Sequence, residues 1–103
     1  MTTFPTLALL LLLSPVRDDP EAFRTRVGEA PRKVAAFIER RANCNHFAGE
    51  EPYDPERAAY LKKTIRELRC GRLSRDWRRL ARAYRGRPDI VRLLKDTEDL
   101  LGW

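Results

Sequence analysis

The chain has 103 residues, of which 21 are basic and 15 acidic, so its side chains carry a formal net charge of +6 at pH 7. This length corresponds to one small domain, whose hydrophobic core alone gives marginal stability. The charge favours anionic partners. The sequence contains no motif for nucleotide, haem or flavin binding, so no cofactor is expected.

Residues 1–16 are predicted to be a signal peptide. Residues 7–13 form an apolar run, and the first charged side chain is that of Arg17. A run of about seven apolar residues is far short of the roughly 20 that a membrane-spanning helix needs, and is typical of a secretory signal peptide. No basic residue precedes the run and no Ala-x-Ala site follows it. An apolar arm on a cytoplasmic protein and a misplaced start codon are therefore alternatives. We expect residues 17–103 to form one domain in the periplasm or outside the cell, with no transmembrane span.

From residue 17 onward, the pattern predicts helices and no strands. Asp19-Pro20-Glu21 begins a short helix over residues 20–27, because aspartate can cap a helix, proline suits its first position and an acid suits its first turn. Gly28 and Pro31 interrupt this pattern. A second helix is expected from about residue 31, with apolar residues on one side: Val34, Phe37, Ile38 and Ala42.

The same start signal, Asp54-Pro55-Glu56, begins the helix with the clearest pattern. Gly71 is well placed to end this helix. Its apolar residues recur at helical spacing, which predicts the helix: Ala58, Leu61, Ile65 and Leu68.

Two further helices complete the predicted fold. Ser74 can cap a helix that ends at Gly86, and Pro88-Asp89 begins the last helix. The apolar residues of the first are Leu73, Trp77, Leu80 and Tyr84; those of the second are Ile90, Val91, Leu94 and Leu101, with Trp103 at the terminus. The prediction is an all-α domain of three to five helices.

The chain has two cysteines, Cys44 and Cys70. In an oxidising compartment an even pair in a small domain predicts a disulfide, which by loop-closure entropy contributes on the order of 3 to 4 kcal/mol. A helix over residues 55–70 is about 24 Å long, so a plain antiparallel hairpin places Cys44 at the end opposite Cys70. The disulfide therefore predicts that residues 45–53 run back along the helix as an ordered, extended crossing segment. Without the bond, the hairpin is preferred.

The crossing segment carries the most reactive side chains of the chain. No metal site is expected, because the Cys-x-His spacing departs from that of zinc sites and no fourth ligand stands out. No catalytic pair of Cys44 and His46 is expected either, since residues two apart on a helix point to different faces and a disulfide removes the thiolate. We expect His46 to be structural. Glu50 and Glu51 are expected to form an acidic surface finger or to pair with a nearby arginine. The candidate binding segment is His46, Glu50, Glu51, Tyr53 and Asp54.

Arginine is the other strong feature. Between Arg69 and Arg87 there are eight arginines and a single acid, Asp76, a net charge of +7. Such a density suits phosphate backbones, lipid headgroups or anionic glycans. The alternative is a merely solvated face, because the whole chain uses 17 arginines against 4 lysines. No known nucleic-acid motif is present. Four of the arginines recur at helical spacing and predict a basic face: Arg72, Arg75, Arg79 and Arg82.

The stretch from Arg40 to Asp54, RRANCNHFAGEEPYD, followed by Leu68-Arg69-Cys70, resembles a group of small exported proteobacterial proteins of unknown function. The resemblance covers much of the domain. It implies export but no particular biochemistry.

A second resemblance concerns Cys70, Asp76, Leu80 and Tyr84, whose spacing is similar to that of LprI-type lysozyme-inhibitor domains. Such domains are small, helical and exported. Ala81 stands where that pattern has an asparagine.

Together these patterns predict an exported, non-catalytic binding protein. One candidate partner is a lysozyme-type enzyme, bound through the acidic segment. A basic lysozyme is repelled at long range by a +6 chain, although the acidic segment complements it locally. The alternatives are an envelope protein that binds an anionic polymer through the basic face, and a cytoplasmic nucleic-acid-binding protein with reduced cysteines.

Overall fold

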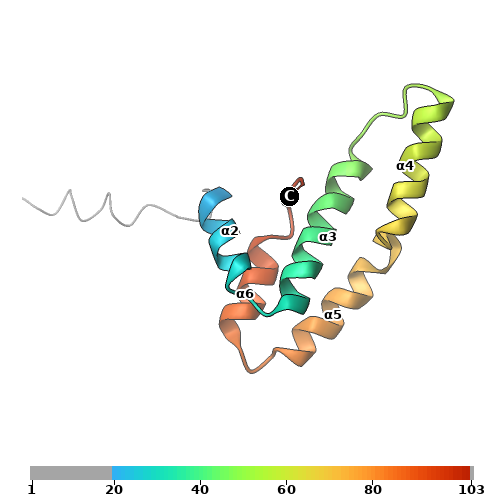
Figure 1. Ribbon diagram of the computed structural model, residues 1–103. Helices are drawn as coiled ribbons and strands as arrows, with labels where there is room; N and C mark the ends of the chain where they lie inside the picture. The colour runs from blue at the N-terminus through green and yellow to red at the C-terminus, as the bar shows by residue number, and fades with distance from the viewer. Residues whose placement is uncertain (1–19, 103) are drawn as a thin grey trace, which may run out of the picture.

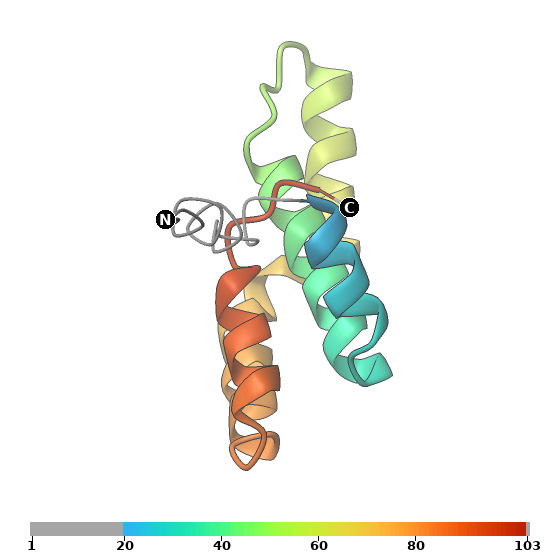
Figure 2. The same cartoon turned by 90° about the vertical axis from the view of Figure 1, so that its left-hand side faces the viewer.

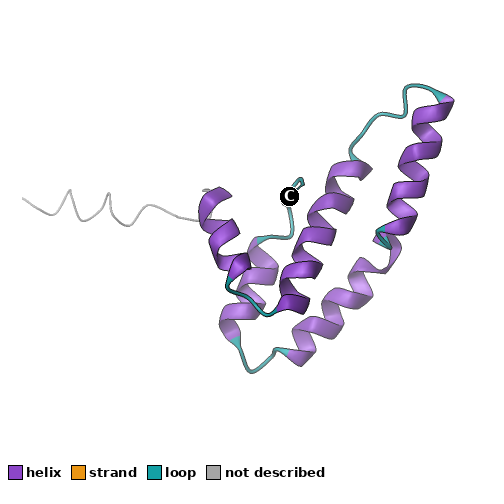
Figure 3. Ribbon diagram, viewed as in Figure 1, coloured by secondary structure: helices purple, strands orange, loops and turns teal. Residues whose placement is uncertain are grey.

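The computed structural model describes residues 20–102, which form helices joined by loops and contain no strand (Figures 1 and 3). The predicted all-α class is confirmed for this part of the chain. The predicted signal peptide, Asp19 and Trp103 lie outside it. The elements are α2 (Pro20–Gly28), α3 (Arg32–Ala48), α4 (Pro55–Glu67), the short 3₁₀ helix η2 (Cys70–Arg72), α5 (Leu73–Ala83) and α6 (Pro88–Asp96). Over residues 20–102, no helix has the length and apolar character needed to cross a membrane.

Helix α3 is the centre of the fold. Helices α2, α5 and α6 all pack against it, with α2 and α5 on different sides of α3 in Figure 1, and α4 lies beside its C-terminal half (Figures 1 and 2). The predicted apolar sides of α3 and α6 meet in the core, and the predicted apolar stripe of α5 packs against them, half-buried. Burying apolar side chains is the main stabilising contribution in such a domain. The buried cluster consists of Val27, Val34, Phe37, Ile38, Ile90, Leu93 and Leu94.

Three local predictions are wrong. Helix α4 ends at Glu67 rather than near Gly71, and Arg69 adopts the left-handed conformation, with φ 56°. Ser74 does not cap α5, because η2 leads directly into that helix and the N–H of Leu73 donates to the carbonyl of Cys70. Leu101 lies beyond α6 and is 76% exposed.

The predicted disulfide between Cys44 and Cys70 is confirmed, with the two Cα atoms 5.7 Å apart. The predicted crossing segment is present, but its bounds differ from the expected residues 45–53. Helix α3 continues four residues beyond Cys44, to Ala48, and a non-helical loop over residues 49–54 then reaches the start of α4 (Figure 1). The four helical residues rise about 6 Å and the six extended residues cover about 20 Å. Together they reach from Cys44 to the start of α4, and α4 then returns to Cys70. The crossing segment is therefore confined to residues 49–54.

Candidate binding surfaces

The loop between α3 and α4 and the first turn of α4, residues 49–57, form a projection that we call the finger. Asp54 caps α4, its Oδ1 accepting a hydrogen bond of 2.6 Å from the N–H of Arg57. The carboxylate of Glu50 contacts two side chains, with 3.1 Å from Oε1 to His46 Nε2 and 3.2 Å from Oε2 to an Nη atom of Arg57. Three of the five candidate segment residues, His46, Glu50 and Asp54, therefore make contacts that stabilise the conformation of the finger.

The other two candidate residues of the finger face solvent. Glu51 is exposed, and Tyr53 is 76% exposed. Tyr60 on α4 is 49% exposed and packs edge to face against Phe47, with ring centroids 6.3 Å apart. Among the predicted segment residues, Glu51 and Tyr53 are those that form no side-chain hydrogen bond or ion pair within residues 20–102.

The polar residues of α3 that precede the finger also contact the rest of the fold. Arg40 forms an ion pair of 2.6 Å with Asp76 on α5. Asn45 donates hydrogen bonds of 2.9 Å to the carbonyls of Glu98 and Leu100, which fixes the C-terminal segment as it crosses α3 (Figure 2). The stretch from Arg40 to Asp54 thus supplies most of the side-chain hydrogen bonds between helices over residues 20–102.

Arg41 is a buried residue that the sequence pattern did not single out, with 7% of its surface exposed. One Nη atom donates to the carbonyl of Leu94 and, at 3.1 Å, to the hydroxyl of Thr97, at the C-terminal end of α6. Burial lowers the pKa of its guanidinium, and the nearby charges of Glu98 and Asp99 partly oppose this effect. A cation at this position complements the helix dipole and satisfies a carbonyl that lacks a helical partner.

The hydrogen bond from Arg40 lowers the pKa of the Asp76 carboxyl below its ordinary value, and the charges of Arg40, Arg79 and Arg75 act in the same direction. A carboxyl with a depressed pKa in the folded state stabilises the fold above its unfolded pKa of about 3.9 and loses this contribution as pH falls through the folded pKa. We expect Asp76→Asn to lower the free energy of unfolding by about 1 kcal/mol at pH 7 and by less at pH 2.5, as measured by urea unfolding. An equal loss at both pH values would contradict this ionic role.

The arginine face lies along α5 and the residues at its two ends, opposite the half-buried apolar stripe of this helix. The predicted residues Arg72, Arg75, Arg79 and Arg82 are all exposed. Two further arginines that were not predicted, Arg78 and Arg85, fall on the same side. We define the arginine face as Arg72, Arg75, Arg78, Arg79, Arg82 and Arg85, all exposed. Across residues 20–102, none of the six forms an ion pair with a carboxylate.

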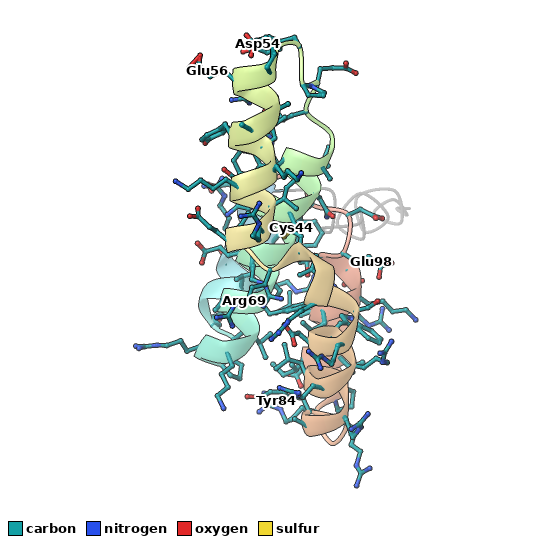
Figure 4. The ribbon with its side chains drawn as sticks, turned by 90° about the vertical axis from the view of Figure 1, so that its right-hand side faces the viewer. Cys44, Asp54, Glu56, Arg69, Tyr84 and Glu98 are labelled. Atoms are coloured by element: carbon teal, nitrogen blue, oxygen red, sulfur yellow. A yellow bond between two sulfur atoms is a disulfide. The ribbon has the colours of Figure 1, made fainter. Side chains whose placement is uncertain are left out.

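The finger and the arginine face lie apart. In Figure 4, Asp54 and Glu56 are at one end of the molecule and Tyr84 is towards the other, with Cys44 and Arg69 between them. Four acids and one arginine give residues 49–57 a net charge of −3, in a chain whose overall charge is +6. The fold therefore separates an acidic finger from a basic helix rather than combining them in one site.

Within the described part of the chain, no group of three or more histidine, cysteine or acidic side chains is arranged to hold a metal ion. Comparisons with known protein families, with curated proteins and with solved structures give no match to this chain. Both resemblances noted from the sequence stay predictions.

Proposed function

We propose that this protein is an exported, non-catalytic binding protein whose arginine face binds an anionic polymer. The observation that carries this proposal is the set of six exposed arginines along α5 and its two ends, none paired with a carboxylate in residues 20–102. Paired surface cations are partly neutralised, whereas unpaired guanidinium groups retain all their donors for phosphate, sulfate or carboxylate oxygens.

The packing of α5 supports the proposal because it fixes which way the arginines point. Leu73, Trp77, Leu80 and Tyr84 pack against the core. The opposite side is therefore presented to solvent as a rigid unit. Asp76, the one acid of α5, forms its ion pair with Arg40 of α3 and not with a member of the arginine face.

The same packing indicates what kind of polymer the face suits. Trp77 and Tyr84 are half-buried on the core side of α5, so they offer no platform for stacking bases. Contacts from arginine to a charged backbone carry no sequence information. The ligand is thus a polymer recognised by its repeated charge, such as duplex nucleic acid or an anionic glycan.

The test is to replace Arg75, Arg79 and Arg82 together by glutamine and to titrate labelled 20-base-pair DNA and labelled dextran sulfate at several salt concentrations. Losing three backbone contacts should reduce the slope of log K against log salt by about 3 for DNA, and should weaken binding by at least about tenfold at 0.15 M salt. Fluorescence anisotropy measures both quantities.

The matched control removes the same three charges from α4, by replacing Lys62, Lys63 and Arg66 with glutamine. These side chains are exposed and lie outside the arginine face. The control should bind within about twofold of the unaltered protein, because loss of distant charge acts only through the screened overall field. Equal weakening in both variants would mean that net charge alone drives binding, and would overturn the proposal.

Export is supported by the disulfide, since such bonds persist in oxidising compartments. The check is the intact mass of the protein from separated periplasm and cytoplasm, alkylated with and without prior reduction. We expect a periplasmic species that lacks its first residues and whose cysteines react only after reduction. A full-length cytoplasmic species with free thiols would leave the nucleic-acid alternative.

A lysozyme-inhibitor-like function is a second candidate, favoured by the 76% exposure of Tyr53 at the finger. Exposed tyrosine on a rigid projection is common at protein interfaces. Glu51→Lys with Tyr53→Ser should remove inhibition of a lysozyme and leave polymer binding unchanged. The variant with glutamine at Arg75, Arg79 and Arg82 should lose polymer binding and keep inhibition of the lysozyme.

A further inference from the structure

A groove runs between the outer sides of α5 and α6, with a volume of about 590 Å³. Its floor is apolar and is formed by Ala81 of α5 and by Pro88 and Val91 at the start of α6. Ala81 and Val91 are half-buried and Pro88 is exposed, so a bound molecule would cover apolar surface that water now contacts. Covering such surface is favourable in proportion to its area.

Three cations surround this floor: Arg85, Arg92 and Lys95. All three are exposed, and none forms an ion pair with a carboxylate in the part of the chain that the structure describes. The groove also contains Asp96, whose Oδ2 lies 3.2 Å from an Nη atom of Arg26 and is therefore already neutralised. The rim thus has uncompensated positive charge beside an apolar floor.

We propose that this groove binds a single-chain anionic amphiphile, with a carboxylate head at the three cations and an alkyl chain along the floor. A small inorganic anion would leave the floor uncovered, and a neutral detergent would leave the cations unpaired. The long stems of arginine and lysine can also flank an alkyl chain while their charged ends reach the head group. This inference goes beyond the proposed function and does not depend on it.

The test is to titrate the ¹⁵N-labelled full chain with dodecanoate below its micelle concentration and to follow amide chemical shifts. We expect saturable shifts centred on Ala81 and Val91. Butanoate, which has the head without the chain, should give no saturable shifts over the same range, and dodecyl maltoside should bind at least about tenfold more weakly, for want of the charge contacts. Saturation by butanoate with the affinity of dodecanoate, or shifts centred outside the groove, would overturn the inference.

Variants separate this site from the polymer-binding face. Arg92→Gln with Lys95→Gln should weaken dodecanoate binding about tenfold, since it removes two exposed charge contacts, each of which contributes a modest part of the affinity. Arg75→Gln with Arg79→Gln, which removes the same charge from the arginine face, should leave it unchanged. Equal weakening by both pairs would show that dodecanoate responds only to overall charge. Failure of polymer binding with intact dodecanoate binding would reject the proposed function alone.

Discussion

Replacing Cys44 and Cys70 by alanine should lower the free energy of unfolding by about 3.5 kcal/mol, the loop-closure value for a separation of 26 residues. For a domain of this size, that corresponds to a fall in Tm of roughly 15 to 25 °C. Thermal unfolding followed by circular dichroism measures it.

The loss of local stability after removal of the disulfide should be greatest in α4. Leu61 is the one buried side chain of this helix, and α4 contributes no residue to the main core cluster. Apart from the disulfide, α4 is held by the pairing of Phe47 with Tyr60 and by the ion pair of Arg57 with Glu50. Hydrogen exchange should therefore accelerate in α4 well before it accelerates in α3 and α6.

Reduction provides the control for this prediction. The unaltered protein in reductant should unfold at the same temperature as the double variant, and the double variant should not respond to reductant. Uniform acceleration of exchange in all helices would show that α4 is not the region that depends on the bond.

Arg41→Ala should lower the free energy of unfolding by about 3 kcal/mol, because it removes a buried charged donor and leaves the carbonyl of Leu94 with only a 3.5 Å contact to the Thr97 hydroxyl. The side chain also lies over the ring of Phe37, 5.0 Å from its centroid, so the substitution removes packing as well. Urea unfolding at pH 7 measures the change.

Two further variants test the cause of this loss. Arg41→Met keeps much of the packing and should cost about 2 kcal/mol, the part due to the lost hydrogen bond to this carbonyl. Arg79→Ala, on the exposed arginine face, should change the free energy of unfolding by less than about 0.5 kcal/mol. Equal effects of Arg41→Ala and Arg79→Ala would show that the contact with α6 does not contribute to stability.

Local signals explain why much of the fold could be predicted. The start of α4 at Asp54-Pro55 depends on one hydrogen bond between residues three apart, from the N–H of Arg57 to Asp54. The buried sides of α3 and α6 follow from helical periodicity, which is visible in any window of about 11 residues. The disulfide could be predicted because the chain has an even number of cysteines, two, in a small domain.

The candidate surfaces were predictable to different extents. The arginine face needs no partner, so helical spacing alone placed Arg72, Arg75, Arg79 and Arg82 on it. The groove between α5 and α6 was not predictable, because its floor and rim come from two helices whose relative position is set by packing. The engagement of Glu50 with both His46 and Arg57 likewise depended on where α4 lies.

By itself the sequence determined the helical class, most helix starts, the cysteine pair and the exposed arginine row, because each depends on local spacing or on composition. Only the tertiary structure decided that α3 extends to Ala48, that Arg69 takes the left-handed conformation and that Arg41 closes the end of α6. Arg41 and Leu94 are 53 residues apart, and Arg40 and Asp76 are 36 apart. Contacts over such separations form when helices pack, and no local pattern in the sequence encodes them.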